Sequence, residues 1–128
     1  KVLLKDLNTS LFIFREPGSA TRLAMEQYLV KHKIAIEKEM ELTSNEAVKQ
    51  AVIAGLGISI MPIIGIKNEL RNGDLQIIEM TDFPLETNWN LIWLKSKNLS
   101  LVAKTFKNHL EENKEKIIKQ HFTWFKDF

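Results

Sequence analysis

Two short polar stretches hold the residues best suited to bind a ligand, and each directly follows a segment predicted to be a strand. The first is Gly18-Ser19-Ala20-Thr21, and the second is Thr43-Ser44-Asn45. Each stretch lies where a helix is expected to begin. Free backbone N–H groups and the positive end of the helix dipole would favour a carboxylate or a phosphate there. The residues leave a second interpretation open, in which these hydroxyl groups only cap their own helices.

The residue pattern predicts no catalytic, metal or cofactor site. His32, His109 and His121 are far apart in the sequence and lack the spacing of a metal-binding motif. No serine stands in a G-x-S-x-G motif, and the acidic residues form no pair that suits an acid and a base. Gly55-x-Gly57 follows a helix and precedes a strand, which is the reverse of a dinucleotide-binding loop. We therefore expect a protein that is not an enzyme.

The stretch from Thr43 to Pro62, TSNEAVKQAVIAGLGISIMP, predicts a helix followed by a strand. Thr43 and Glu46 have the T-x-x-E spacing of a capping box, which would start the helix at Thr43. Gly55 is expected to end the helix in a left-handed conformation, and Gly57 to lead into an apolar strand. Pro62 suits the first turn of a further helix.

Strands and helices are predicted to alternate along the chain, with short loops between them. Strands are predicted at residues 11–14, 36–42, 58–61, 75–80 and 89–94. Helices are predicted at residues 19–31, 43–54, 62–71 and from Ser100 onwards. This order indicates an α/β fold in which helices flank a mostly parallel sheet. The polar segment 81–88, TDFPLETN, is the best candidate for a crossing between two lobes.

Composition limits the class of protein. The 128 residues are 45% hydrophobic and 27% charged, which is typical of a globular domain. The net charge of +2 gives little overall attraction to nucleic acid. No apolar run approaches the roughly 20 residues of a membrane span, and no signal peptide is recognisable. The absence of cysteine suits a cytoplasmic location, and the first residue, Lys1, suggests a fragment of a longer chain.

Several segments resemble the effector-binding region of LysR-type transcriptional regulators. Residues 15–22, REPGSATR, resemble that family's R-E-x-G-S-G-T-R signature, with Ala20 in place of a glycine. Residues 44–58 are similar to its S-N-E-x-I-K and V-x-x-G-L-G-I segment, and residues 69–75 to its E-L-x-x-G-x-L turn. Residues 89–106 resemble its late strand and final helix, and Asp6-Leu7 its first D-L pair. The resemblance covers about residues 3 to 112 in order.

The resemblance implies a periplasmic-binding-protein-like (type 2) fold with a small-molecule effector, often an anion, between two lobes. Residues 1–88 would be the second lobe, and residues 89–128 the returning strand and C-terminal helix of an incomplete first lobe. DNA would be bound only through an N-terminal domain that this chain lacks. The full-length protein would form a homodimer or a homotetramer, without contact with a membrane.

We hypothesise that the effector binds at the two polar helix starts. The expected effector-binding residues are Ser19, Thr21, Thr43, Ser44, Asn45, Met61 and Pro62, with the last two at the wall of the site. Arg15 is expected to pair with Glu16 or another acidic residue rather than with the effector. Two alternatives remain open, namely the solute-binding lobe of a transport system and a purely structural interaction domain.

Overall fold

The computed structural model describes residue 7 and residues 9–127, and the chain forms two compact units. The first unit is Lys1–Leu85 and the second is Glu86–Phe128. The division lies inside the polar segment 81–88 that the sequence singled out. Asp6, part of the D-L pair, is outside the described residues. Each unit is described by itself below.

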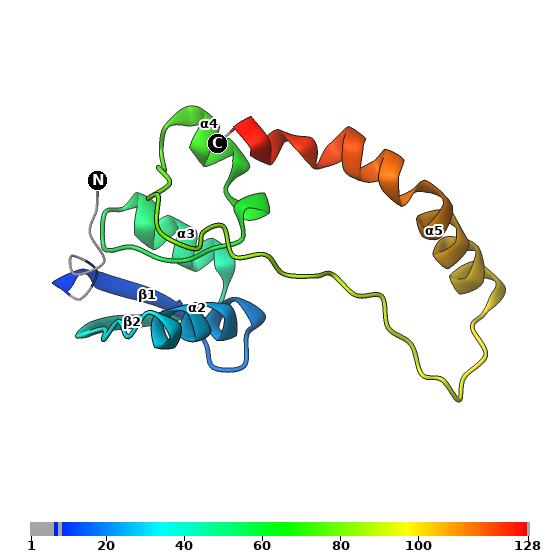
Figure 1. Cartoon of the computed structure of the whole chain (residues 1–128), viewed down its shortest axis with the longest axis horizontal. Coiled ribbons are helices and arrows are strands. Elements are labelled where there is room, and N and C mark those ends of the chain that lie inside the picture. The colour runs from blue at the N-terminus through cyan, green and yellow to red at the C-terminus, as the bar shows by residue number, and fades with distance from the viewer. Residues whose placement is uncertain (1–6, 8, 128) are drawn as a thin grey trace. The chain divides into compact units, whose positions relative to one another are not determined.

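The sheet of the first unit is parallel, and its central strand is β1, Leu11–Arg15 (Figure 1). On one side β1 pairs with β2, Lys38–Leu42, in a register that sets Leu11 opposite Lys38. On its other side β1 forms a single parallel bridge with Ile58. The Ile13 N–H donates to the Ile58 carbonyl at 2.8 Å, and the Ile58 N–H donates to the Leu11 carbonyl at 3.0 Å.

The strand predicted at 58–61 is therefore reduced to one bridge. The Ser59 hydroxyl donates to the Ile13 carbonyl at 2.6 Å. That carbonyl is the acceptor that the next bond of a parallel ladder would use. A side chain thus takes the place of the backbone donor, and the ladder stops.

Two helices cover opposite faces of β1. Helix α2, Ala20–Lys31, contributes Met25 and Tyr28 to a buried cluster with Phe12 and Phe14. Helix α3, Asn45–Ile53, contributes residues to a second buried cluster, around Ile13. Successive side chains of a strand point to opposite faces, so the short run LFIF supplies both cores. This arrangement confirms the predicted α/β class with a parallel sheet.

The start of α3 corrects one expectation. Its N-cap is Ser44, whose hydroxyl accepts from the Ala47 N–H at 3.0 Å, and Thr43 lies outside the helix. Glu46 is bound to Gln50 and Lys49, so it does not close a capping box with Thr43. Ser44 has extended backbone angles and stands three residues before Ala47, which is the geometry of a capping serine.

The helix predicted at 62–71 is split in two. A single 3₁₀ turn, η1, spans Ile63–Gly65, with Pro62 as its N-cap, and α4 spans Lys67–Asn72. Ile66, at φ −128°, separates them because that angle is outside the helical range. Gly73 ends α4 in the left-handed conformation, at φ 81°.

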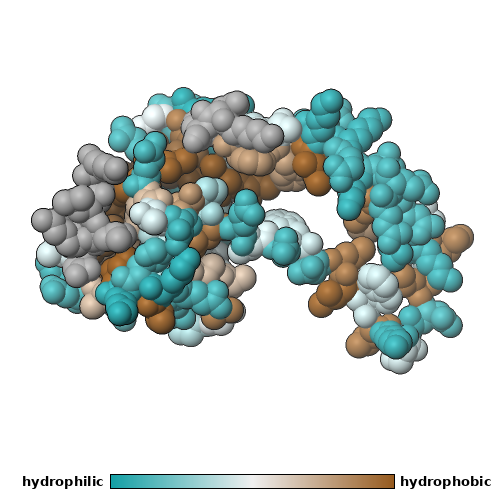
Figure 2. Space-filling model, in the orientation of Figure 1, coloured by the Kyte–Doolittle hydropathy of each residue, from teal (hydrophilic) through white to brown (hydrophobic). Residues whose placement is uncertain are grey.

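The second unit is dominated by α5, Leu101–His121, which is capped by Ser100, where the sequence predicted a helix to begin. A short 3₁₀ segment, η2, follows at Thr123–Asp127. Hydrophilic side chains cover much of the visible face of α5, with hydrophobic ones among them (Figure 2). No helix in the described part of the chain is long and apolar enough to cross a membrane.

Two predicted strands, 75–80 and 89–94, are not formed. Both segments are extended or irregular, and Trp89 and Ile92 are 89% and 85% exposed. A strand needs the backbone of a neighbour to satisfy its N–H and C=O groups. Within the described residues, neither segment has such a neighbour. Apolar composition alone therefore misidentified these two elements.

Candidate functional site

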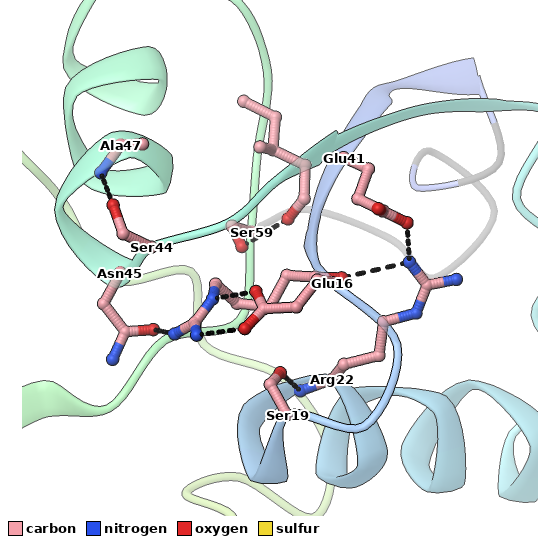
Figure 3. Close-up of polar contacts among 10 residues, drawn as sticks. Glu16, Ser19, Arg22, Glu41, Ser44, Asn45, Ala47 and Ser59 are labelled. Carbon is pink, nitrogen blue, oxygen red and sulfur yellow. Dashed lines mark hydrogen bonds and ion pairs between the residues drawn. The ribbon is translucent and has the colours of Figure 1, made fainter.

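The two polar helix starts both lie at the carboxyl end of the sheet (Figure 3). Ser19 caps α2, with its hydroxyl accepting from the Arg22 N–H at 3.0 Å, and Ser44 caps α3 in the same way. Both serines follow a strand that ends two to four residues earlier, so the strands position them. Each helix start also presents N–H groups that have no acceptor within the helix.

Arg15, at the end of β1, connects the two starts. Its guanidinium donates to the side-chain oxygen of Asn45, the first residue of α3. Its backbone carbonyl accepts from Arg22, in the first turn of α2, at 3.1 Å. One residue thus contacts both helices. Sequence pattern could not predict this, because the contact with Asn45 spans 30 positions.

Arg15 also forms a two-pronged ion pair with Glu16, at 2.7 and 2.8 Å. The hydrogen bonds from Arg15, followed by one from the backbone of Glu16 itself, lower the pKa of the Glu16 carboxyl to about 2. The same pair raises the pKa of Arg15. The expected ion pair with Glu16 is confirmed, so the Arg15 charge is already balanced by a neighbouring carboxylate.

Arg22 is a second organising cation that the sequence analysis did not select. It pairs with Glu26 at 2.7 Å and with Glu41 of β2 at 3.3 Å, and its guanidinium lies 4.6 Å from the centre of the Phe14 ring. The Arg22–Glu26 spacing of four residues is a signal that the sequence contains. Like Arg15, Arg22 is held by carboxylates, which fix its position and neutralise its charge.

The predicted site residues fall into three groups. Ser19 and Ser44 cap helices, and Asn45 holds Arg15. The Thr21 and Thr43 side chains form no hydrogen bond with the rest of the described chain. A capping hydroxyl accepts with its oxygen but keeps an O–H to donate, so four hydroxyl groups at this edge can still donate to a ligand.

Met61 and Pro62 have different surroundings from those hydroxyl groups. Met61 is half-buried and packs against the cluster around Ile13, while Pro62 is exposed ahead of η1. A cavity of about 210 Å³ lies next to Met61 in the first unit. Met61 lines this cavity, and the other six predicted residues do not. The cavity wall is mostly apolar, formed by residues such as Phe12, Leu29, Ile58, Ile60, Ile78 and Phe83.

The chemistry available at the polar edge is recognition. Within residues 7 and 9–127, no group of three or more His, Asp or Glu side chains is placed to hold a metal ion. Hydroxyl donors, helix N-termini and two neutralised arginines suit an anion that accepts several hydrogen bonds. The geometry supports binding of such a ligand without supplying a reacting group.

Comparisons with known proteins identify the family. Residues 1–115 match the LysR substrate binding domain. The chain is 42% identical over 117 residues to the transcriptional activator CmpR of Synechocystis, covering 91% of this chain and 38% of CmpR. It is 43% identical over 99 residues to a RuBisCO operon transcriptional regulator of Acidithiobacillus ferrooxidans, covering 77% of this chain and 32% of that protein. The chain thus spans about a third of these relatives.

A solved structure supports the same assignment. The regulatory domain of CcmR from Synechocystis, in complex with 2-PG, is 36% identical, with a TM-score of 0.73. The match covers 84% of this chain and 51% of the CcmR chain. With a family match over most of its length and this shared fold, the chain belongs to the LysR substrate-binding domain family.

Proposed function

We propose that this chain is part of the effector-binding regulatory domain of a bacterial LysR-type transcriptional regulator, and that it senses a small anionic metabolite. The observation that carries the proposal is its similarity to the CcmR regulatory domain, which was solved with 2-PG. We therefore take 2-phosphoglycolate as the first candidate effector. The proposed binding residues are those of the polar edge, Ser19, Thr21, Thr43, Ser44 and Asn45.

The charges at this edge favour recognition by neutral donors. Arg15 and Arg22 are both paired with carboxylates, so an anion would be met chiefly by hydroxyl and backbone N–H groups. Such donors can bind a phosphate or carboxylate without an unpaired positive side chain, and the positive ends of the helix dipoles add to the attraction. Thr21 and Thr43 are the most available donors because they have no competing bond in the described part of the chain. Met61 and Pro62 would complete the wall.

Effector binding would act on transcription through parts of the protein beyond this chain. Residues 1–88 would be the second lobe and residues 89–128 a portion of the first. Closure on the effector would shift the balance between two arrangements of a homodimer or homotetramer. DNA would be bound by a separate N-terminal domain in the cytoplasm, and the chain would catalyse no reaction.

The alternative of a transport protein is less well supported. A solute-binding lobe would share this architecture, and fold alone does not decide function. The relatives named above are transcriptional regulators, at 42% and 43% identity. That similarity favours regulation.

The test is a binding measurement on the full-length protein by calorimetry and thermal shift, with 2-phosphoglycolate as the probe. Glycolate and inorganic phosphate are measured for comparison, because each contains one of the two anionic groups of 2-phosphoglycolate. We expect 2-phosphoglycolate to raise the melting temperature more than either half, and Thr43→Val with Thr21→Val to remove most of that rise. Neither threonine hydroxyl supports the fold, so the free protein should melt within about 2 °C of wild type.

Ser100→Ala is the matched control, because Ser100 caps α5 as Ser19 and Ser44 cap α2 and α3 but lies outside the proposed site. It should leave the ligand-induced shift unchanged. The site assignment fails if the threonine double variant binds as wild type does. The effector class fails if none of the three anions binds wild type.

A further inference from the structure

His32 is a half-buried titratable side chain that the proposed effector site does not use. It is the C-cap residue of α2, where the helix dipole favours a positive charge. Its Nε2 atom is buried and lies 3.2 Å from Asp82 Oδ2, without forming a hydrogen bond. Among the described side-chain N and O atoms, Nε2 is the only buried one without a hydrogen bond. The pair is therefore a contact that protonation would strengthen.

The partner of His32 belongs to the segment that leads out of the first unit. Asp82 stands four residues before Glu86, where the second unit begins. The end of α2 contacts this segment in three further ways. Lys31 Nζ lies 2.6 Å from the same Asp82 oxygen, the Tyr28 hydroxyl donates to the Thr81 carbonyl at 3.0 Å, and the Tyr28 ring packs edge-on against Phe83 at 4.7 Å.

We propose that the end of α2 and residues 81–83 form a protonation-sensitive latch, which holds the segment leading to the second unit more firmly when His32 is charged. The titratable and charged groups in contact with His32 are Asp82 and Tyr28, whose ring lies 4.3 Å away, and Lys31 shares the Asp82 carboxylate. The latch needs no ligand, so it does not rest on the proposed function.

The two side chains that contact His32, Asp82 and Tyr28, both keep the charge state that the latch needs. Lys31 first, and His32 after it, lower the pKa of Asp82, so its carboxylate stays charged in mild acid. Burial, and then Asp82, raise the pKa of Tyr28, which keeps its hydroxyl protonated and able to donate. A charged imidazolium attracts the Asp82 carboxylate more strongly than a neutral imidazole does, so the His32–Asp82 contact is firmer when His32 carries a proton. Lys31 and Tyr28 keep the latch partly closed throughout.

The test is amide hydrogen exchange of peptides covering residues 78–88, measured without ligand at pH 5.5 and pH 8.0 and corrected for intrinsic rates. Wild type should exchange about 1.5- to 5-fold more slowly at pH 5.5, the range expected from one partly exposed ion pair. His32→Gln and Asp82→Asn should each abolish this difference. Asparagine tolerates the left-handed conformation that Asp82 adopts, at φ 62°, so this substitution removes the charge alone.

Controls separate the latch from general effects of pH. His109→Gln, on α5, removes a histidine of the second unit and should behave as wild type. Lys31→Gln should raise exchange at both pH values and keep the ratio between them, because it removes the Lys31–Asp82 pair but leaves His32 and Asp82 in place. The proposal is overturned if wild type shows no pH difference, or if the difference survives in Asp82→Asn. Either outcome would leave the effector proposal intact.

Discussion

Arg15, the last residue of β1, donates a hydrogen bond to the side-chain oxygen of Asn45, the first residue of α3. The same arginine binds Glu16, and its carbonyl accepts from Arg22 of α2. The carboxyl end of the central strand is thereby fixed to the starts of both helices. A ligand bound there would meet donors whose positions are set by the sheet, which lowers the entropic cost of binding.

Glu16→Gln should make the chain less stable at pH 6 but not in strong acid. The carboxyl has a pKa of about 2 in the fold, against an ordinary value of 4.5. Its pair with Arg15 therefore contributes stability above about pH 4.5, and that contribution is lost as the pH falls towards 2. Urea unfolding at pH 6, 4 and 3 should show the midpoints of the variant and wild type converging.

Glu112→Gln is the comparison for that series. Glu112 is exposed on α5 and forms no ion pair within the described residues. Its variant should follow wild type at every pH. A constant gap between Glu16→Gln and wild type across the series would show that the lost contact is not the ion pair.

Ser44→Ala should destabilise the chain by about 1 kcal/mol, because it removes the N-cap of α3. Thr43→Ala should change the free energy of unfolding by less than about 0.5 kcal/mol, since Thr43 is exposed and outside the helix. Chemical denaturation of both variants measures the difference. A larger loss of unfolding free energy for Thr43→Ala than for Ser44→Ala would instead support the capping box predicted from the sequence.

Gly57→Ala should destabilise the chain by about 1–3 kcal/mol, through crowding of a packed backbone. A Cβ at this position would overlap the Leu11 carbonyl oxygen, which is the acceptor for the Ile58 N–H. Gly65→Ala is the matched control, because a Cβ there meets nothing within 4 Å and its backbone is not left-handed. That variant should unfold within about 1 kcal/mol of wild type. Equal effects of the two substitutions would contradict the close approach of Gly57 to β1.

Features set by short-range physics were predictable from the sequence. β1 and α2 have nearly the predicted bounds, and Ser19 and Ser100 stand at the starts of their helices, where the sequence predicted them. Gly55 adopts the left-handed conformation that was predicted to end its helix. The motifs at 15–22 and 44–58 indicated the family that the comparisons then identified. Each of these signals depends on residues within a few positions of one another.

Features that depend on distant partners were decided by the tertiary structure. Nothing local distinguishes Thr43 from Ser44 as the cap, or gives Arg15 its bond to Asn45, 30 positions away. The apolar segments 75–80 and 89–94 read as strands, yet they lack a pairing neighbour in the described chain. His32 meets Asp82 only because α2 packs beside the segment that leaves the first unit. Sequence pattern fixes which groups a residue offers, whereas hydrogen bonds and ion pairs need a second group brought within about 3 Å by the fold.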